Sequence, residues 1–230
     1  MNLNIKVLAA ALLCLVLSAC ATTPELNREL VHQEKINTIN LDQMDQNISI
    51  EKADNTATSA AAGGLLGVLV GGAIDGNINS KRRTALEPFI EMLDGLNVNM
   101  VLKNALEHNM SDGKAFSEEV VIDSEYDKDI KKPFLTPILS PSVIMLADYS
   151  GVGVSLLAST SQKSTTNKQN RYKRTYASEQ AMDAEFLAKR EANKQYWKDN
   201  PLILKEKIVD GLYDVAKQFT DDYNADQVVK

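Results

Sequence analysis

The sequence predicts an α+β fold in which a mostly antiparallel sheet, formed as a hairpin or meander, packs with several helices behind an N-terminal tether. In the middle of the chain, apolar residues alternate with polar ones, as on half-buried strands. Near the C-terminus they keep helical spacing instead. Strands and helices fall in separate blocks, which favours the α+β class over alternating βαβ units.

The first residues form a secretory leader that ends in a lipobox. Lys6 precedes an apolar run over 7–17, which is shorter than the roughly 20 residues of a spanning helix. The run ends in Leu-Ser-Ala-Cys, the pattern in which the cysteine of bacterial lipoproteins receives a diacylglycerol. We expect a signal peptide over 1–19 and diacylglycerol plus N-acyl lipid on Cys20. The alternative is a soluble secreted protein in which Cys20 is incidental.

The lipidated cysteine sets the expected location and the domain boundaries. Two or three acyl chains suffice for a stable anchor, so membrane contact is expected through the lipid. In bacterial lipoproteins an aspartate after the cysteine favours the inner membrane, and here that position is Ala21. We therefore expect the outer membrane, facing the periplasm. Residues 20–34 are predicted as the lipid-anchored tether, and residues 35–230 as one periplasmic domain.

Composition argues against nucleic-acid binding and against sites built from cysteine. The chain carries 25 Lys and Arg against 31 Asp and Glu, whereas nucleic-acid binders show the reverse balance. Its two cysteines are Cys14, which leaves with the leader, and Cys20, which is acylated. Neither a disulfide nor a metal-thiolate site is therefore expected in the domain.

Alternation and turn residues locate the strands. The predicted strands cover residues 35–42, 47–52, 119–124, 143–149, 152–157 and 171–176. The Ser-Gly pair before 152–157 predicts a hairpin, and the segment with Tyr172 is expected to begin the third strand of a meander.

Helical spacing predicts four helices. Two of them, over 86–93 and 98–106, look like core-packing helices, with Asn97 as the cap of the second. A third covers 180–198. The fourth begins after Asn200, with Pro201 at its first position, and is the most regular pattern in the chain.

A glycine-rich segment over 60–76 reads AAAGGLLGVLVGGAIDG. As a helix, it places Gly63, Gly67 and Gly71 on one face and Gly64 and Gly72 beside them, which lets another backbone approach closely. Its apolar part is short for a membrane span. We expect a helical hairpin or a glycine-faced helix, packed on the domain or lying at the membrane surface; an inserted oligomeric segment and a flexible linker are the alternatives.

The chain lacks the common catalytic signatures. No glycine follows Ser155 as a nucleophile elbow requires, and neither a phosphate-binding loop nor a dinucleotide fingerprint is present. His32 and His108 have no second ligand at helical spacing, so both are expected to be solvated. The acidic run 123–129 lacks the features of a calcium loop. The sequence therefore predicts no enzyme, no metal and no cofactor apart from the lipid.

A basic segment stands out in this acidic chain. The candidates for contact with anionic lipid or an acidic partner are Lys163, Lys168, Arg171, Lys173 and Arg174. The alternative is a solvated hairpin loop.

The order of features resembles a group of uncharacterised bacterial envelope lipoproteins with a lipobox and a glycine-zipper-like segment. The resemblance rests on AIDG followed by a basic run, VIMLADYSGVGVSLL, RYKRTYAS and a C-terminal helix. It supplies no catalytic residue. The expected function is a non-enzymatic lipoprotein that binds another envelope component, with a homo-oligomer allowed. The alternative is a subunit of a pore or channel-associated oligomer assembled through the glycine-rich segment, and a hydrolase is a distant third.

Overall fold

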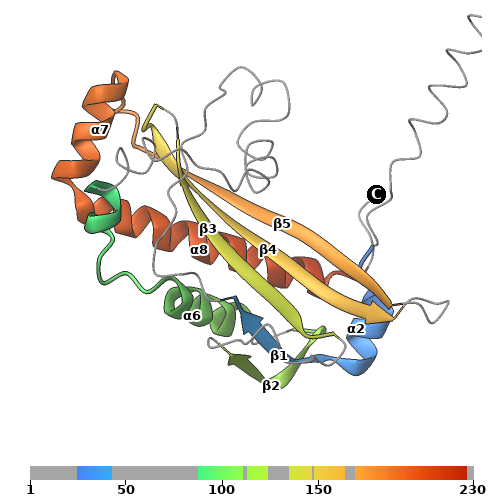
Figure 1. Cartoon of the computed structure of the whole chain (residues 1–230). Coiled ribbons are helices and arrows are strands. Elements are labelled where there is room, and N and C mark those ends of the chain that lie inside the picture. The colour runs from blue at the N-terminus through green and yellow to red at the C-terminus, as the bar shows by residue number, and fades with distance from the viewer. Residues whose placement is uncertain are drawn as a thin grey trace, which may run out of the picture.

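The computed structural model describes residues 25–42, 88–110, 113–123, 135–146, 148–163 and 169–226. This part of the chain forms one five-stranded mixed sheet packed with helices, which confirms the predicted α+β class (Figure 1). In chain order the elements are α2 (Arg28–Glu34), β1 (Ile36–Leu41), α6 (Val98–Met110), β2 (Phe116–Asp123), β3 (Pro137–Met145), β4 (Gly151–Lys163), β5 (Gln169–Ala181), α7 (Arg190–Asp199) and α8 (Pro201–Asn224). A short helix also spans 88–92.

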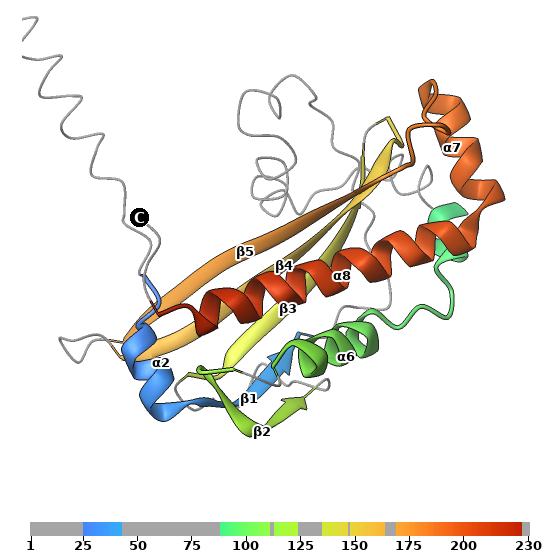
Figure 2. The same cartoon turned by 180° about the vertical axis from the view of Figure 1, so that it is seen from behind.

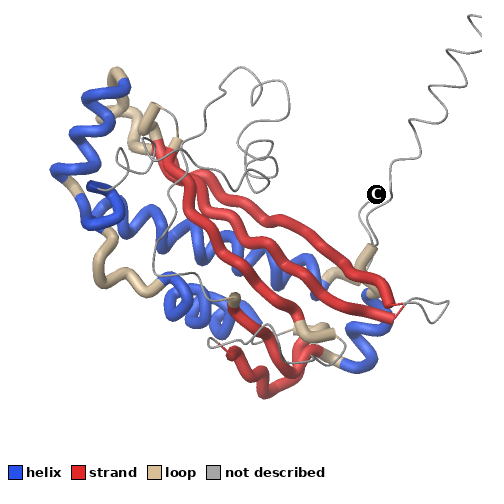
Figure 3. Tube along the Cα trace, in the orientation of Figure 1, coloured by secondary structure: helices blue, strands red, loops and turns tan. Residues whose placement is uncertain are grey.

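The strand order is β2-β1-β3-β4-β5. β3, β4 and β5 form the predicted antiparallel meander, and they are the long strands that lie side by side in Figure 3. β1 pairs in parallel with both β2 and β3, which residue alternation alone does not reveal. Parallel neighbours need a long connection, and the stretch between β1 and β2, which includes α6, provides one.

β3 starts at Pro137, whereas the predicted strand covers 143–149. The prediction begins too late because Pro137 and Pro141 are typical of a loop. The Leu139 carbonyl accepts a hydrogen bond from the Asp42 amide, so odd-numbered residues of β3 turn their backbone groups toward β1. The missing N–H of Pro141 therefore faces the side where β1 has already ended at Leu41. Proline is tolerated in a strand where its N–H would have no ladder partner.

β4 and β5 are both 13 residues long and pair without a register shift from Gly151 opposite Ala181 to Lys163 opposite Gln169. The predicted strands, 152–157 and 171–176, lie in the first part of β4 and of β5 and end well before the observed strands do. At the β3–β4 turn, a Cβ added to Gly151 would lie 2.6 Å from the Gln180 carbonyl oxygen, so glycine permits the close strand approach there.

The C-terminal helix is confirmed. α8 runs along one face of the sheet with α6 beside it (Figure 2). Its buried side is continuous and consists of Leu204, Ile208, Gly211, Leu212, Val215, Ala216, Phe219, Thr220 and Tyr223. The predicted cap of α6 is also confirmed, because Asn97 Oδ1 accepts the Met100 amide at 2.9 Å.

The helix predicted over 180–198 is only half right. Gln180 and Ala181 end β5, where they pair with Val152 and Gly151 of β4. Helical structure begins at Arg190. Strand pairing over the full length of β4 therefore overrides the helical spacing of the apolar residues in this segment.

The predicted tether extends too far into the domain. Residues 28–34 form α2, and Val31 on this helix is fully buried in the core together with Leu26. Asn27 Oδ1 caps the helix by accepting the Leu30 amide at 3.1 Å. The folded domain thus includes residues before 35. Cys20, the predicted strand 47–52, the glycine-rich segment and the acidic residues 124–129 lie outside the described residues.

Candidate functional site

Two groups of polar side chains lie on opposite faces of the sheet. The Asp222 cluster, on the face that the helices cover, consists of Arg28, Tyr172, Arg174, Tyr176 and Asp222. The second group belongs to the open face, which we define as the strand side chains that point away from the helices. The two groups differ in how completely their polar atoms are hydrogen-bonded.

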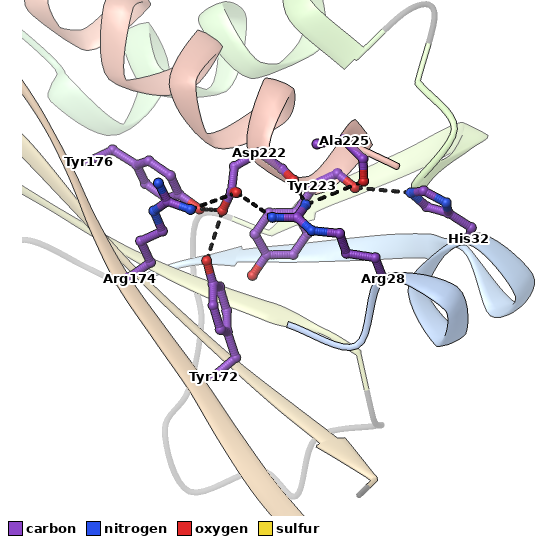
Figure 4. Close-up of polar contacts among 8 residues, drawn as sticks. All are labelled: Arg28, His32, Tyr172, Arg174, Tyr176, Asp222, Tyr223 and Ala225. Carbon is purple, nitrogen blue, oxygen red and sulfur yellow. Dashed lines mark hydrogen bonds and ion pairs between the residues drawn. The ribbon is translucent and has the colours of Figure 1, made fainter. Parts of the chain in front are cut away.

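The Asp222 cluster joins three elements at the C-terminal end of α8 (Figure 4). Asp222 Oδ1 accepts from Arg28 Nη2 of α2 and from Arg174 Nη1 of β5, both at 2.7 Å. Oδ2 accepts the hydroxyls of Tyr172 at 2.8 Å and Tyr176 at 2.6 Å. Arg28 also donates to the Asp222 carbonyl. The carboxylate is therefore surrounded by four donors.

The protonation states follow from this arrangement. Burial alone would raise the pKa of the Asp222 carboxyl, but hydrogen bonds from both tyrosines and Arg28, with the charge of Arg174, hold that pKa below its ordinary 3.8. Burial, with the hydrogen bond to Asp222, raises the pKa of Tyr172, and burial raises the pKa of Tyr176. The carboxyl stays ionised and the phenols stay protonated.

This cluster has the chemistry of a structural tie. A general base needs an acceptor position open to a substrate proton, and the four donors already occupy the Asp222 oxygens. The side chain is 9% exposed, which leaves little access from solvent. Beside it, the Tyr223 hydroxyl lies 2.5 Å from Thr160 Oγ1, and His32 Nε2 lies 3.2 Å from the Tyr223 carbonyl. His32, predicted to be solvated in the tether, is thus part of this packed end.

The open face follows from side-chain alternation. Leu41, Leu139 and Ala158 are buried in the core on the helix side, so their neighbours along each strand point the other way. The open face includes Asp123 of β2, Asn40 of β1, Ile138, Ser140 and Ser142 of β3, Ser155, Leu157 and Ser159 of β4, and Arg171, Lys173, Thr175, Ala177 and Glu179 of β5. Figure 1 looks at this face, and none of the described helices lies on it. Most of its side chains are small or polar.

One row across the open face contains unpaired polar atoms. Strand register places Asn40, Ile138, Ser159 and Lys173 next to one another on β1, β3, β4 and β5. Asn40 is 1% exposed and Ser159 is 8% exposed. Neither Asn40 Nδ2 nor Ser159 Oγ has a hydrogen-bond partner among the described residues. A buried polar atom without a partner costs roughly 1–3 kcal/mol.

Three other buried side-chain atoms in the described part of the chain are also unpaired: Arg28 Nε, Asn99 Oδ1 and the Tyr149 hydroxyl. They lie on separate elements. The Arg28 guanidinium is already held by Asp222, and Arg190 lies over the Tyr149 ring, 5.2 Å from its centroid. Asn40 and Ser159 differ because both flank Ile138 on one face. We name Asn40, Ile138 and Ser159 the open-face triplet.

The structure divides the predicted basic segment. Arg171 and Lys173 are exposed on the open face, whereas Arg174 points to the helix side and pairs with Asp222. Lys163 ends β4, with its backbone opposite Gln169, and Lys168 lies outside the described residues. Of these five residues, Lys173 lies opposite Ser159 of the open-face triplet, and Arg171 lies two residues away on β5, opposite Ser161.

Sequence reasoning missed Asp222, Arg28, Asn40 and Ser159. Asn40 carried a signal, because an amide inside the alternating run INTINL marks the polar face of a strand. Its burial depends on neighbouring strands that are distant in sequence, so one strand could not reveal it. Asp222 carried no local signal, since its four donors come from residues 28 and 172–176.

Within the described ranges, no three His, Cys, Asp or Glu side chains gather as metal ligands. No helix there is long and apolar enough to cross a bilayer. His108 lies on the exposed side of α6, its ring centroid 6.4 Å from that of Tyr213.

No family model, no curated protein and no solved structure matches this chain. Both oxygens of the Asp222 carboxylate are paired and Arg28 Nε is the one unpaired buried side-chain atom of that cluster, while the open-face triplet retains a donor and a hydroxyl without partners among the described residues. The open face is the stronger candidate for a binding site.

Proposed function

We propose that this protein is a non-enzymatic lipoprotein of the bacterial outer membrane, facing the periplasm, whose domain binds another envelope component through the open face. The leader and the lipobox ending at Cys20 support the anchor, and the resemblance to envelope lipoproteins supports the setting. The saturated Asp222 carboxylate favours a binding role over catalysis.

The open-face triplet carries the proposal. Buried polar atoms in folded proteins nearly always have a hydrogen-bond partner. Because Asn40 Nδ2 and Ser159 Oγ are buried, a bound partner can supply the missing hydrogen bonds, for instance through its carbonyl groups, only if binding uncovers these atoms. Ile138 between them offers apolar contact, and Lys173 beside them adds a positive charge. These features fit a protein partner with exposed carbonyl or carboxylate groups.

Site-specific photo-cross-linking in intact cells tests this proposal. A photoreactive amino acid replaces Ile138 on the open face, and in a matched control it replaces Glu206 on the exposed side of α8. We expect one adduct of defined mass from position 138 and none from position 206. Equal adducts from both positions, or none from position 138, would exclude the open face as the binding surface.

The anchor has its own test. Cys20→Ala should release the protein from the membrane fraction, because the lipid is the expected attachment. The fractionation includes a high-salt wash to remove proteins held by charge alone. A Cys20→Ala protein that still sediments with membranes after this wash would overturn the lipoprotein assignment.

A further inference from the structure

The long strand β5 forms one edge of the sheet, and its backbone directions are fixed by its pairing with β4. The Met182 amide donates to the Ser150 carbonyl at 2.7 Å, which continues the β4–β5 ladder by one residue pair. Even-numbered residues of β5 therefore turn their backbone groups toward β4. The odd-numbered residues from Arg171 to Glu179 turn theirs to the outer edge of β5, where no described strand pairs with them. Gln218 Nε2 occupies one of these groups, the Ala177 carbonyl, at 3.0 Å.

Natural edge strands usually carry features that prevent pairing with another chain, such as proline, bulges, short length or exposed charges, and β5 has exposed charges of this kind in Arg171 and Lys173. β5 has 13 residues, no proline and no register shift against β4. Its charges have a particular symmetry on the open face. Arg171 and Glu179 are both exposed, and each lies four residues from Thr175.

This symmetry fits a second copy of the chain. If two β5 strands pair antiparallel about a twofold axis at Thr175, Arg171 of each copy lies directly opposite Glu179 of the other. Opposite charges placed this way stabilise strand pairs. On the helix side the same register sets Arg174 opposite Tyr176, and within one copy that guanidinium already lies 5.6 Å from the Tyr176 ring centroid. Shifting the axis by two residues loses both Arg–Glu pairs.

We propose that the outer edge of β5 is a homodimer interface in which two copies pair antiparallel about Thr175. The two five-stranded sheets then form one continuous sheet with both open faces on the same side. Gln218, which is exposed, releases the Ala177 carbonyl to the other copy. The interface uses the strand edge and needs no envelope partner, so it is independent of the proposed function.

The helices allow this arrangement. α8 packs on both β4 and β5, through Gly211 against Val154 and through Phe219 against Tyr176. With strands about 4.8 Å apart, a helix over the line between β4 and β5 lies roughly 10 Å from its twofold mate. Packed helices are usually 8–10 Å apart. The two α8 helices can therefore lie side by side under the joined sheet.

Cysteine cross-linking in the full-length chain tests the register. Thr175 is opposite itself, and directly opposed residues in a hydrogen-bonded pair have Cα atoms about 5.5 Å apart, within disulfide range. Thr175→Cys should give a covalent dimer on oxidation. Lys173→Cys should not, because it lies opposite Ala177, yet a mixture of Lys173→Cys and Ala177→Cys chains should cross-link. The unmodified protein controls for its native cysteines. No dimer from Thr175→Cys, or equal dimer from Lys173→Cys alone, overturns the proposal.

Charge exchange provides a second test that does not depend on a new thiol. Sedimentation of the purified mature protein in detergent should show a dimer for the native chain. Arg171→Glu should weaken dimerisation roughly tenfold or more, since it sets like charges opposite each other twice. Arg171→Glu combined with Glu179→Arg should restore it. Lys173→Glu makes the same charge change two residues away and should have little effect. A monomeric native chain, or equal effects of Arg171→Glu and Lys173→Glu, contradicts the inference.

Discussion

The two faces of the sheet differ in how their polar groups are paired. On the helix side, the Asp222 carboxylate receives four donors, and at the other end of the sheet Trp197 Nε1 donates to the Tyr149 carbonyl at 2.8 Å. On the open face, Asn40 and Ser159 keep polar atoms without partners among the described residues. If the proposed function holds, stability depends on the helix side and binding on the open face of one sheet, so each can be altered separately.

The largest expected effect comes from removing the carboxylate of the Asp222 cluster. Asp222→Ala leaves the Arg28 guanidinium, whose side chain is 11% exposed, without its counter-ion. Removing one partner of a buried ion pair costs about 3–5 kcal/mol. Thermal or urea unfolding should show a loss of that size in the free energy of unfolding.

The neighbouring residue provides the control for this prediction. Asp221 pairs with Lys217 at 2.6 Å, but both side chains are more than 60% exposed. Exposed pairs contribute only about 0–1 kcal/mol. Equal losses from Asp221→Ala and Asp222→Ala would mean that the cluster does not hold α2 and α8 to the sheet.

Acid should weaken the same cluster. Because the folded pKa of Asp222 lies below its ordinary 3.8, the native state binds fewer protons than the unfolded state in this range. This contribution to stability is present above the ordinary pKa and is lost as the pH falls through the folded value. Between pH 5 and pH 3 the free energy of unfolding should therefore fall more steeply with decreasing pH in the native protein than in Asp222→Asn. Parallel pH profiles of the two proteins would contradict the assigned pKa direction.

A smaller effect is expected where α8 approaches the sheet most closely. A Cβ at Gly211 would lie 2.5 Å from Val154 Cγ2, and Val154 is fully buried in the central meander strand. Replacing glycine by alanine inside a helix normally stabilises by about 0.5–1 kcal/mol. Overpacking costs about 1–3 kcal/mol, so Gly211→Ala should be destabilising overall. A rise in melting temperature would show that the two elements can separate without loss; Asp210→Ala, at an exposed site, is the control.

Local patterns predicted the elements better than their pairing. The helical spacing in α8 and the Asn97 cap are local, and both were predicted correctly. The extension of β5 through Ala181 depends on the opposite strand, so spacing alone gave a helix there. Arg28 lies in a polar segment that resembles a tether, and only the distant Asp222 explains its burial. The candidate site could not be predicted for the same reason, since Asn40, Ile138 and Ser159 come from three separate strands.

The most direct test of the division between the two faces changes one open-face residue and reads out both stability and binding. Asn40→Leu keeps the approximate shape but removes the unpaired donor, which should leave the melting temperature equal or higher. The same substitution, in the protein with a photoreactive residue at position 138, should abolish the adduct in intact cells. Asn37→Leu, at an exposed position of the same strand, should leave the adduct unchanged. A clear fall in melting temperature, or an adduct that persists in Asn40→Leu, would contradict the account.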